Sequence, residues 1–284
     1  MSIQNLPEHL QKAINRAKLS LIAAPQDYIP FIDHTLLSDN ISALEITNLC
    51  AEAKKHGTAS VCVPPKWVRL AAQELEGSDT FVATVIDFPH GQGLPQDAVL
   101  TAQIALKDGA KQLDLVMDYE SLHVNPDDKE VAKRIQAVKS VIAKEGSQAN
   151  FKVILKAGVY QDAELLKKAA RIALENGADS VKTSTGKAPI REFQHITEKD
   201  SATPETAAIL MSAVADFNDA NGTQRGVKIS GGVSNIEDCA FYMALAKDIM
   251  GEESLTPEFM RFGASASLLN SLIGSAAPNQ PSPY

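Results

Sequence analysis

The sequence predicts a (β/α)8 TIM barrel, an α/β fold, and two patterns along the chain support this prediction. Short runs rich in β-branched residues recur, and each is followed by a longer segment with helical periodicity. Strict alternation of strand and helix is typical of parallel strands joined by crossover helices. Eight such units in about 250 residues match a closed barrel. An open sheet often carries a glycine-rich first turn, and none follows the first strand here.

The eight predicted strands are short apolar runs: Phe31–Thr35, Ser60–Val63, Thr80–Ile86, Gln112–Met117, Phe151–Leu155, Ser180–Thr183, Gly226–Ile229 and Met260–Gly263. The clearest helices between them are amphipathic: Ala43–His56, Asp97–Asp108, Val131–Glu145, Asp162–Asn176 and Pro204–Asp219. Three helices are followed by Gly57, Gly109 and Gly177. Glycine readily adopts the left-handed conformation that closes a helix, so these boundaries have a physical cause.

The chain ends differ from the repeating pattern. Residues 1–28 form a predicted helical extension, in which Leu6–Ala23 is an extra helix that covers the barrel floor. Residues 276–284, rich in Pro and Ser, are predicted to be a flexible tail. Since no low-complexity linker divides the middle, we expect residues 1–284 to form one domain.

Composition excludes several classes of protein. The 284 residues are 44% hydrophobic and 22% charged, as in ordinary globular proteins, which argues against disorder. A net charge of −8 disfavours general binding to nucleic acid or an anionic membrane. No run of about 18 uncharged apolar residues occurs, so no membrane span is expected. Cys50, Cys62 and Cys239 are too few and too scattered for a disulfide framework, which favours a reducing, cytoplasmic location.

Three charged residues interrupt apolar strands, namely Asp114, Lys182 and Lys228. Because side chains alternate along a strand, each points opposite to its apolar neighbours. If those neighbours pack against the helices, all three charges face the barrel interior. Taken singly, each fits a structural ion pair at the barrel mouth equally well.

Together, the three charges predict a Schiff-base site. Lys182 and Lys228 lie on neighbouring strands, roughly 5 Å apart, and two cations at that distance repel by about 3 kcal/mol. Such repulsion lowers the pKa of one lysine from about 10.4 towards 8. A neutral amine can attack a carbonyl, and Asp114 can compensate one charge and pass protons. The residues alone do not decide which lysine is the nucleophile.

Loops after the last three strands are rich in glycine and hydroxyl residues, in the segments Thr183–Lys187, Ser230–Gly232 and Gly263–Ser265. Exposed backbone N–H groups at such loops bind anions, and barrels frequently hold phosphate after strands 7 and 8. One such loop alone is ordinary capping, but three adjacent loops with Lys187 predict a monophosphate site. No nucleotide-binding glycine motif follows a strand. The six histidines lack metal-ligand spacing, so no zinc site and no metal are expected.

These residues resemble the deoxyribose-phosphate aldolase family. The matching segments are Phe31–Leu37, Ala83–Gly91, Leu113–Val116, Val181–Lys187, Val227–Val233 and Arg261–Ser265. The similarity runs from about residue 30 to 270. It implies a cofactor-free, metal-independent class I aldolase that reversibly cleaves 2-deoxy-D-ribose 5-phosphate to acetaldehyde and D-glyceraldehyde 3-phosphate in deoxyribose catabolism. Its partners are then small phosphosugar and aldehyde substrates, and we expect a homo-oligomer, a dimer.

The resemblance also implies residue roles. Lys182 forms the Schiff base, Lys228 lowers its pKa and Asp114 joins the proton relay. The implied substrate-binding residues are Asp33, Thr35, Leu37, Cys62, Thr185, Gly186, Lys187, Gly231, Gly232, Gly263, Ser265, Ser267 and the terminal Tyr284, carried by a mobile tail. Read alone, Cys62 is equally a small buried hydrophobic residue.

Three features depart from the family pattern. Lys156 stands at the end of the fifth strand, where many relatives carry glutamate, and it either alters the charge at the barrel mouth or faces solvent. Arg191–Asp200 is an insertion before the helix that starts at Thr203-Pro204. Ser265 and Ser267 are separated by one residue, whereas the family often has two adjacent serines.

Two other functions fit the same residues. The first is a different Schiff-base barrel acting on a phosphosugar, such as a transaldolase or a keto-acid aldolase. The second is a phosphosugar-binding protein without catalysis, which serves regulation or assembly.

Overall fold

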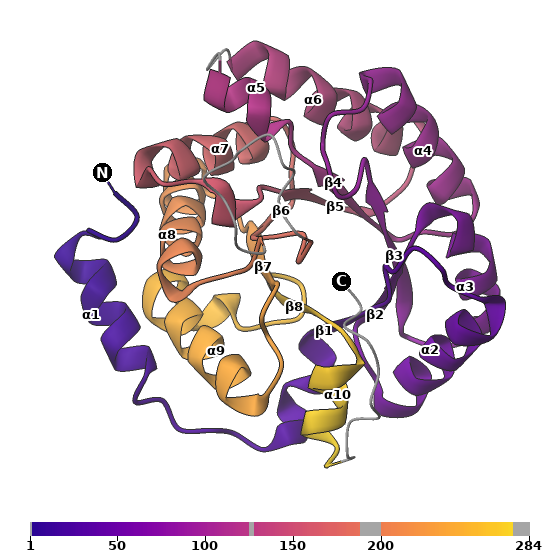
Figure 1. Cartoon of the computed structure of the whole chain (residues 1–284), viewed down its shortest axis with the longest axis horizontal. Coiled ribbons are helices and arrows are strands. Elements are labelled where there is room, and N and C mark those ends of the chain that lie inside the picture. The colour runs from indigo at the N-terminus through magenta and orange to yellow at the C-terminus, as the bar shows by residue number, and fades with distance from the viewer. Residues whose placement is uncertain (1, 125–127, 188–199, 275–284) are drawn as a thin grey trace.

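Eight parallel strands close into a barrel in the order of the chain, and helices surround it (Figure 1). This computed structural model describes residues 2–124, 128–187 and 200–274. Each strand pairs with the next, and the last pairs with the first through Asp33 opposite Gly263. The predicted (β/α)8 barrel is therefore confirmed.

The strands lie within one residue of the predicted bounds at each end. They are β1 Ile32–Thr35, β2 Ser60–Val63, β3 Phe81–Ile86, β4 Gln112–Val116, β5 Asn150–Ile154, β6 Ser180–Lys182, β7 Gly226–Ser230 and β8 Met260–Ala264. Such accuracy follows from their composition, because β-branched runs between turn residues rarely fit any other element.

The helices of the outer ring are α2 Ala43–His56, α3 Val68–Glu74, α4 Pro95–Lys107, α5 Tyr119–Val124, α6 Asp128–Lys144, α7 Ala163–Glu175, α8 Pro204–Asn221, α9 Ile236–Met250 and α10 Ala266–Leu272. Local chemistry sets several ends. Ser42, Thr203 and Asn235 begin α2, α8 and α9 with reciprocal side-chain caps. Gly57 ends α2 at a φ of 77°. Among the residues that the structure describes, no helix has the length and hydropathy to cross a bilayer.

The N-terminal helix differs from its prediction. Helix α1, Glu8–Ala17, ends six residues early and packs against α9 and α8, outside the helix ring (Figure 1). The prediction that it covers the barrel floor is wrong. One stripe of the helix is buried, namely Leu10, Ala13, Ile14 and Ala17, and two outer helices bury such a stripe well. The predicted tail and Tyr284 lie outside the described residues.

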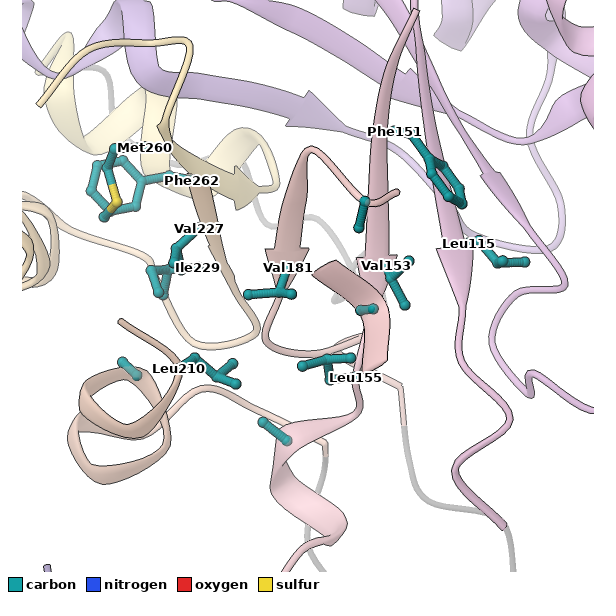
Figure 2. Close-up of a cluster of buried hydrophobic side chains, with 14 of the residues drawn as sticks. Leu115, Phe151, Val153, Leu155, Val181, Leu210, Val227, Ile229, Met260 and Phe262 are labelled. Atoms are coloured by element: carbon teal, nitrogen blue, oxygen red, sulfur yellow. The ribbon is translucent and has the colours of Figure 1, made fainter. Parts of the chain in front are cut away.

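The main apolar core fills the space between the barrel and its helices. Outward-facing strand residues form it, and Figure 2 shows them on neighbouring strands with Leu210 of α8: Leu115, Phe151, Val153, Val181, Val227, Ile229 and Phe262. Each large apolar side chain buried there contributes about 1.5–3 kcal/mol. Because side chains alternate along a strand, this outer packing directs Asp114, Lys182 and Lys228 into the barrel.

We predict that Leu10→Ala lowers the free energy of unfolding by about 2–3 kcal/mol, because a leucine packed between α1 and the barrel helices is lost. Urea denaturation followed by circular dichroism measures the change. The control is Leu19→Ala. Because Leu19 is 83% exposed, this substitution should change the free energy of unfolding by no more than about 0.5 kcal/mol. Equal effects of the two substitutions would show that α1 is not part of the folded unit.

Candidate active site

One buried cluster of charges lies inside the barrel. Lys228 of β7 places its Nζ 2.6 Å from Asp33 Oδ2 and 2.8 Å from Asp114 Oδ2. Lys182, its register partner on β6, places its Nζ 3.2 Å from the same Asp114 oxygen. The two lysine nitrogens are therefore neighbours that share one carboxylate oxygen. The structure brings Lys182, Lys228 and Asp114 together, as the sequence predicts.

Lys228 remains an ammonium ion. Burial by itself lowers the pKa of a lysine, but the carboxylates of Asp114 and Asp33 outweigh that effect and raise the pKa of Lys228 above its usual value. This side chain is therefore a fixed positive charge at the centre of the cluster.

Lys182 has the opposite behaviour. Burial is the largest cause of its lowered pKa, and the charge of Lys228 lowers it further, while Asp114 opposes both. The sequence predicts a lowered pKa for one lysine from the neighbouring ammonium alone. The structure shows that burial lowers the pKa of Lys182 more than the charge of Lys228 does. A sequence shows which strands are adjacent but not how far a side chain lies from water.

Asp114 is held as a carboxylate. Burial alone would raise its pKa, but Lys228 and then Lys182 outweigh burial and lower the pKa to about 2. Gln112 Nε2 donates to Asp114 Oδ1 at 2.9 Å. Since such a weak base keeps a proton only briefly, Asp114 is suited to relay protons to and from Lys182.

The Asp33 carboxylate has four partners among the residues that the structure describes. Ser60 Oγ and Arg261 Nη1 donate to its Oδ1 at 2.7 and 2.8 Å. Gln112 Nε2 donates to Oδ2 at 3.0 Å, beside Lys228. Burial alone would raise the pKa of Asp33. The charges of Lys228 and Arg261 outweigh burial and hold this pKa well below its usual range. The structure places Asp33 as the second counter-ion of Lys228, and its contact with substrate hydroxyls stays a prediction.

Lys152 is a charged residue of the interior that the sequence analysis missed. It lies on β5 opposite Asp114, is 1% exposed, and donates from Nζ to Asn150 Oδ1. Burial lowers its pKa to about 7, against the charges of Asp114 and Asp33. The signal was available: Lys152 interrupts β5 between Phe151 and Val153, as Lys228 interrupts β7.

A small apolar cluster lines the inner face of β2 and β3. It contains Leu37, Cys62, Ala83 and Val85, with Phe88 packed against it. Burial raises the pKa of the Cys62 thiol to about 11, so the thiol stays protonated. Two predicted pocket residues, Leu37 and Cys62, are therefore together. The third, Thr35, donates its hydroxyl to the backbone oxygen of Asp33 at 2.7 Å.

The predicted phosphate residues follow three neighbouring strands at the carboxyl end of the barrel. Gly231 and Gly232 after β7 have φ values of 78° and 97°. After β8, Ser265 Oγ and Ser267 Oγ are 2.8 Å apart, so the separated serines meet in space. After β6, the N–H groups of Thr185 and Gly186 are bonded to Asp200. Gly263 of β8 lies so near Lys228 that a Cβ there would be 2.9 Å from its Cε.

This arrangement supplies an amine with a lowered pKa, a fixed cation and a carboxylate between them, on the strands that lead to the predicted phosphate loops. In the described ranges, no group of three or more His, Cys, Asp or Glu side chains is placed to hold a metal ion. Proton transfer and nucleophilic attack on a carbonyl are the chemistry that these groups provide.

A family model for DeoC/LacD family aldolases matches residues 28–266. The chain belongs to this family. Among solved structures, the chain is similar to a candidate deoxyribose-phosphate aldolase from Coccidioides immitis, which is 30% identical, with a TM-score of 0.73 and coverage of 96% of this chain and 98% of that chain.

Two further structures support the family assignment. A candidate deoxyribose-phosphate aldolase from Toxoplasma gondii ME49 is 25% identical, with a TM-score of 0.74 over 92% of this chain and 97% of that one. The deoxyribose phosphate aldolase from Aeropyrum pernix, described as a tetramer, is 25% identical. Its TM-score is 0.69, with coverage of 94% of this chain and 96% of that chain. This protein is therefore an aldolase of the DeoC/LacD family.

We predict that Lys228→Leu raises the pKa of Lys182. The substitution removes a repelling cation and leaves Asp114 to Lys182 alone, and both changes favour the ammonium form. The pH at which acetaldehyde and cyanoborohydride label half of Lys182 should rise by about one unit or more. The control is Lys139→Leu, which removes a lysine paired with Asp179. An unchanged midpoint in Lys228→Leu would contradict the electrostatic role of Lys228.

Proposed function

We propose that this aldolase is a class I deoxyribose-phosphate aldolase, which reversibly cleaves 2-deoxy-D-ribose 5-phosphate through a Schiff base on Lys182. One observation carries the proposal. Asp114 Oδ2 lies within 3.2 Å of two lysine nitrogens, of which Lys228 has a raised pKa and Lys182 a lowered one. The relatives described as deoxyribose-phosphate aldolases support this substrate.

The first stage forms the Schiff base. Neutral Lys182 attacks the C1 aldehyde of the open-chain sugar, and the amine proton moves to the carbonyl oxygen, giving a carbinolamine. Loss of that hydroxyl as water leaves a protonated imine on Lys182. Asp114 relays a proton from water to the departing oxygen, and Lys228 stays an ammonium ion throughout.

The second stage breaks the C2–C3 bond. A base removes the proton of the C3 hydroxyl, C3 becomes the aldehyde of D-glyceraldehyde 3-phosphate, and the bonding electrons pass to C2 to form an enamine on Lys182. Protonation at C2 and addition of water then release acetaldehyde and regenerate the amine. The nearby Lys228 charge favours the neutral enamine over the protonated imine. The two stages of the proposed reaction use only protein side chains and water.

Residues at the rim hold the phosphate in this proposal. Lys187, Gly231, Gly232, Ser265 and Ser267 follow β6, β7 and β8, and so surround one end of the substrate. Leu37 and Cys62 form the apolar wall against which the two-carbon end lies. Tyr284 lies outside the described residues, and its approach to the site stays a prediction.

We further propose a homo-oligomer with a cytoplasmic role in deoxyribose catabolism. The tetrameric description of the Aeropyrum pernix relative supports self-association. Cys50, Cys62 and Cys239 are all buried and unpaired, as expected in a reducing compartment. Light scattering of the purified protein measures the number of subunits.

We predict that acetaldehyde followed by borohydride adds one ethyl group to Lys182, found by peptide mass mapping. Lys182→Ala should abolish both labelling and sugar cleavage while thermal unfolding changes little. Lys152→Met serves as the control, because Lys152 is also a buried lysine with a lowered pKa. Lys182 should still be labelled in this variant.

Three other results would contradict the proposed nucleophile or the proposed activity. Cleavage retained in Lys182→Ala, or label on Lys152, would refute Lys182 as the nucleophile. Labelled Lys182 with turnover only of a transaldolase or keto-acid substrate would indicate a different Schiff-base barrel. Label on no particular lysine would favour a binding protein without catalysis.

A further inference from the structure

A buried aspartate joins the loops that follow β5 and β6. Asp200 is 1% exposed and lies three residues before the Thr203 cap of α8. Its Oδ2 accepts hydrogen bonds from Thr185 N at 2.7 Å and Thr185 Oγ1 at 2.9 Å. Its Oδ1 accepts one from Gly158 N at 3.2 Å. One carboxylate thus fills a cradle of donors from two loops.

The backbone of Asp200 binds the same loop. Gly186 N donates to Asp200 O at 3.0 Å, and Asp200 N donates to Lys187 O at 3.1 Å. Thr185 Oγ1 also accepts from Lys187 N at 3.2 Å. Three successive amides, those of Thr185, Gly186 and Lys187, are therefore occupied within the protein. These three amides are therefore not free to bind an anion, and Lys187 is the cationic residue that the same segment carries.

The residues after Asp200 hold the next loop in the same way. Ala202 N donates to Gly231 O at 2.9 Å. A Cβ at Gly231 would lie 2.9 Å from Ser201 Cα, so the two backbones are in close contact. Residues 200–202 are therefore wedged between the β6 and β7 loops, both of which belong to the predicted phosphate site.

Lys156 provides the opposite charge. It is 1% exposed, follows β5, and holds its Nζ 4.3 Å from the centre of the Tyr119 ring. The alternative that it faces solvent is wrong. Burial lowers the pKa of Lys156, and the charges of Asp200 and Glu120 oppose this. Burial raises the pKa of Asp200, and bonds from Thr185 and the charge of Lys156 oppose that. Each buried ion favours the charged form of the other.

We propose that Asp200 is a positioning residue for the phosphate loop, an internal anion that occupies the cradle of Thr185 and Gly158. By filling that cradle it fixes the backbone conformation of Thr185, Gly186 and Lys187. It also excludes a second anion from the cradle, so the substrate phosphate binds towards the β7 and β8 loops. The identity of the ligand as a phosphosugar rests on the proposed function, whereas the order that Asp200 imposes on the loop does not.

The test measures binding of inorganic phosphate to the full-length protein by calorimetry. Asp200→Ala should raise the Kd about tenfold, because ionic hydrogen bonds that order the loop are lost. Asp200→Asn keeps one acceptor oxygen and should raise the Kd only about threefold. Labelling of Lys182 by acetaldehyde, which carries no phosphate, should stay within about twofold of the wild type in both variants.

Asp179→Asn is the matched control. Asp179 also accepts a backbone N–H, from Phe151 at 2.9 Å, and pairs with Arg225, but it stands at the amino end of β6. This substitution should lower the melting temperature without changing the Kd for phosphate. An Asp200→Asn variant with unchanged or tighter phosphate binding would overturn the proposal, and so would equal losses in phosphate binding and Lys182 labelling. Absence of phosphate binding in the wild type would also overturn it.

Kinetics separate this inference from the proposed function. If the wild type cleaves 2-deoxyribose 5-phosphate, Asp200→Asn should raise KM and change kcat little, and cleavage of unphosphorylated 2-deoxyribose should be unaffected. If the wild type binds phosphate but does not cleave the sugar, the proposed function fails, and the Kd values still decide the role of Asp200.

Discussion

The sharing of one carboxylate oxygen by two buried lysines is the interaction on which the site depends. Lys228 lies within 2.8 Å of two carboxylates, whereas Lys182 has part of one at 3.2 Å. Both lysines lose hydration, but only Lys228 recovers enough attraction to remain charged. The same residue type therefore has a raised pKa at one position and a lowered pKa at the other, because the two lysines have unequal numbers of counter-ions.

The barrel makes this cluster possible by closing. Asp33 and Arg261 are 228 positions apart in the chain, and they pair only because β8 closes against β1. Asp33, Asp114 and Lys228 are each held by two or more charged or hydrogen-bonding partners, which offset their loss of hydration. Lys182 pairs with Asp114 at 3.2 Å, and its pKa is lowered. The apolar layer outside the strands supplies the stability that lets the interior be polar (Figure 2).

The loops after β5 and β6 are also held together by a buried carboxylate with several partners. Asp200 takes its donors from the loops after β5 and β6, and the charge of Lys156 favours its carboxylate form. Strand β6 ends at Lys182, and Lys187 follows five residues later. The proposed Schiff-base lysine and the proposed phosphate-binding lysine thus belong to one short segment, so the conformation of that segment sets the distance between them.

The barrel and its strand bounds could be predicted from the sequence, because alternation and capping are local properties. Alternation also predicts that Asp114, Lys182 and Lys228 point inward if their apolar neighbours pack against the helices, and the same rule identifies Lys152. The folded chain was needed to show the four partners of the Asp33 carboxylate, the packing of α1 on α8 and α9, and the contacts of Asp200 with the loops after β5 and β6. These features join segments distant in the chain, so they depend on how the strands register around the closed barrel. Depth from solvent, which contributes most to the lowered pKa of Lys182, is likewise a property of the whole fold.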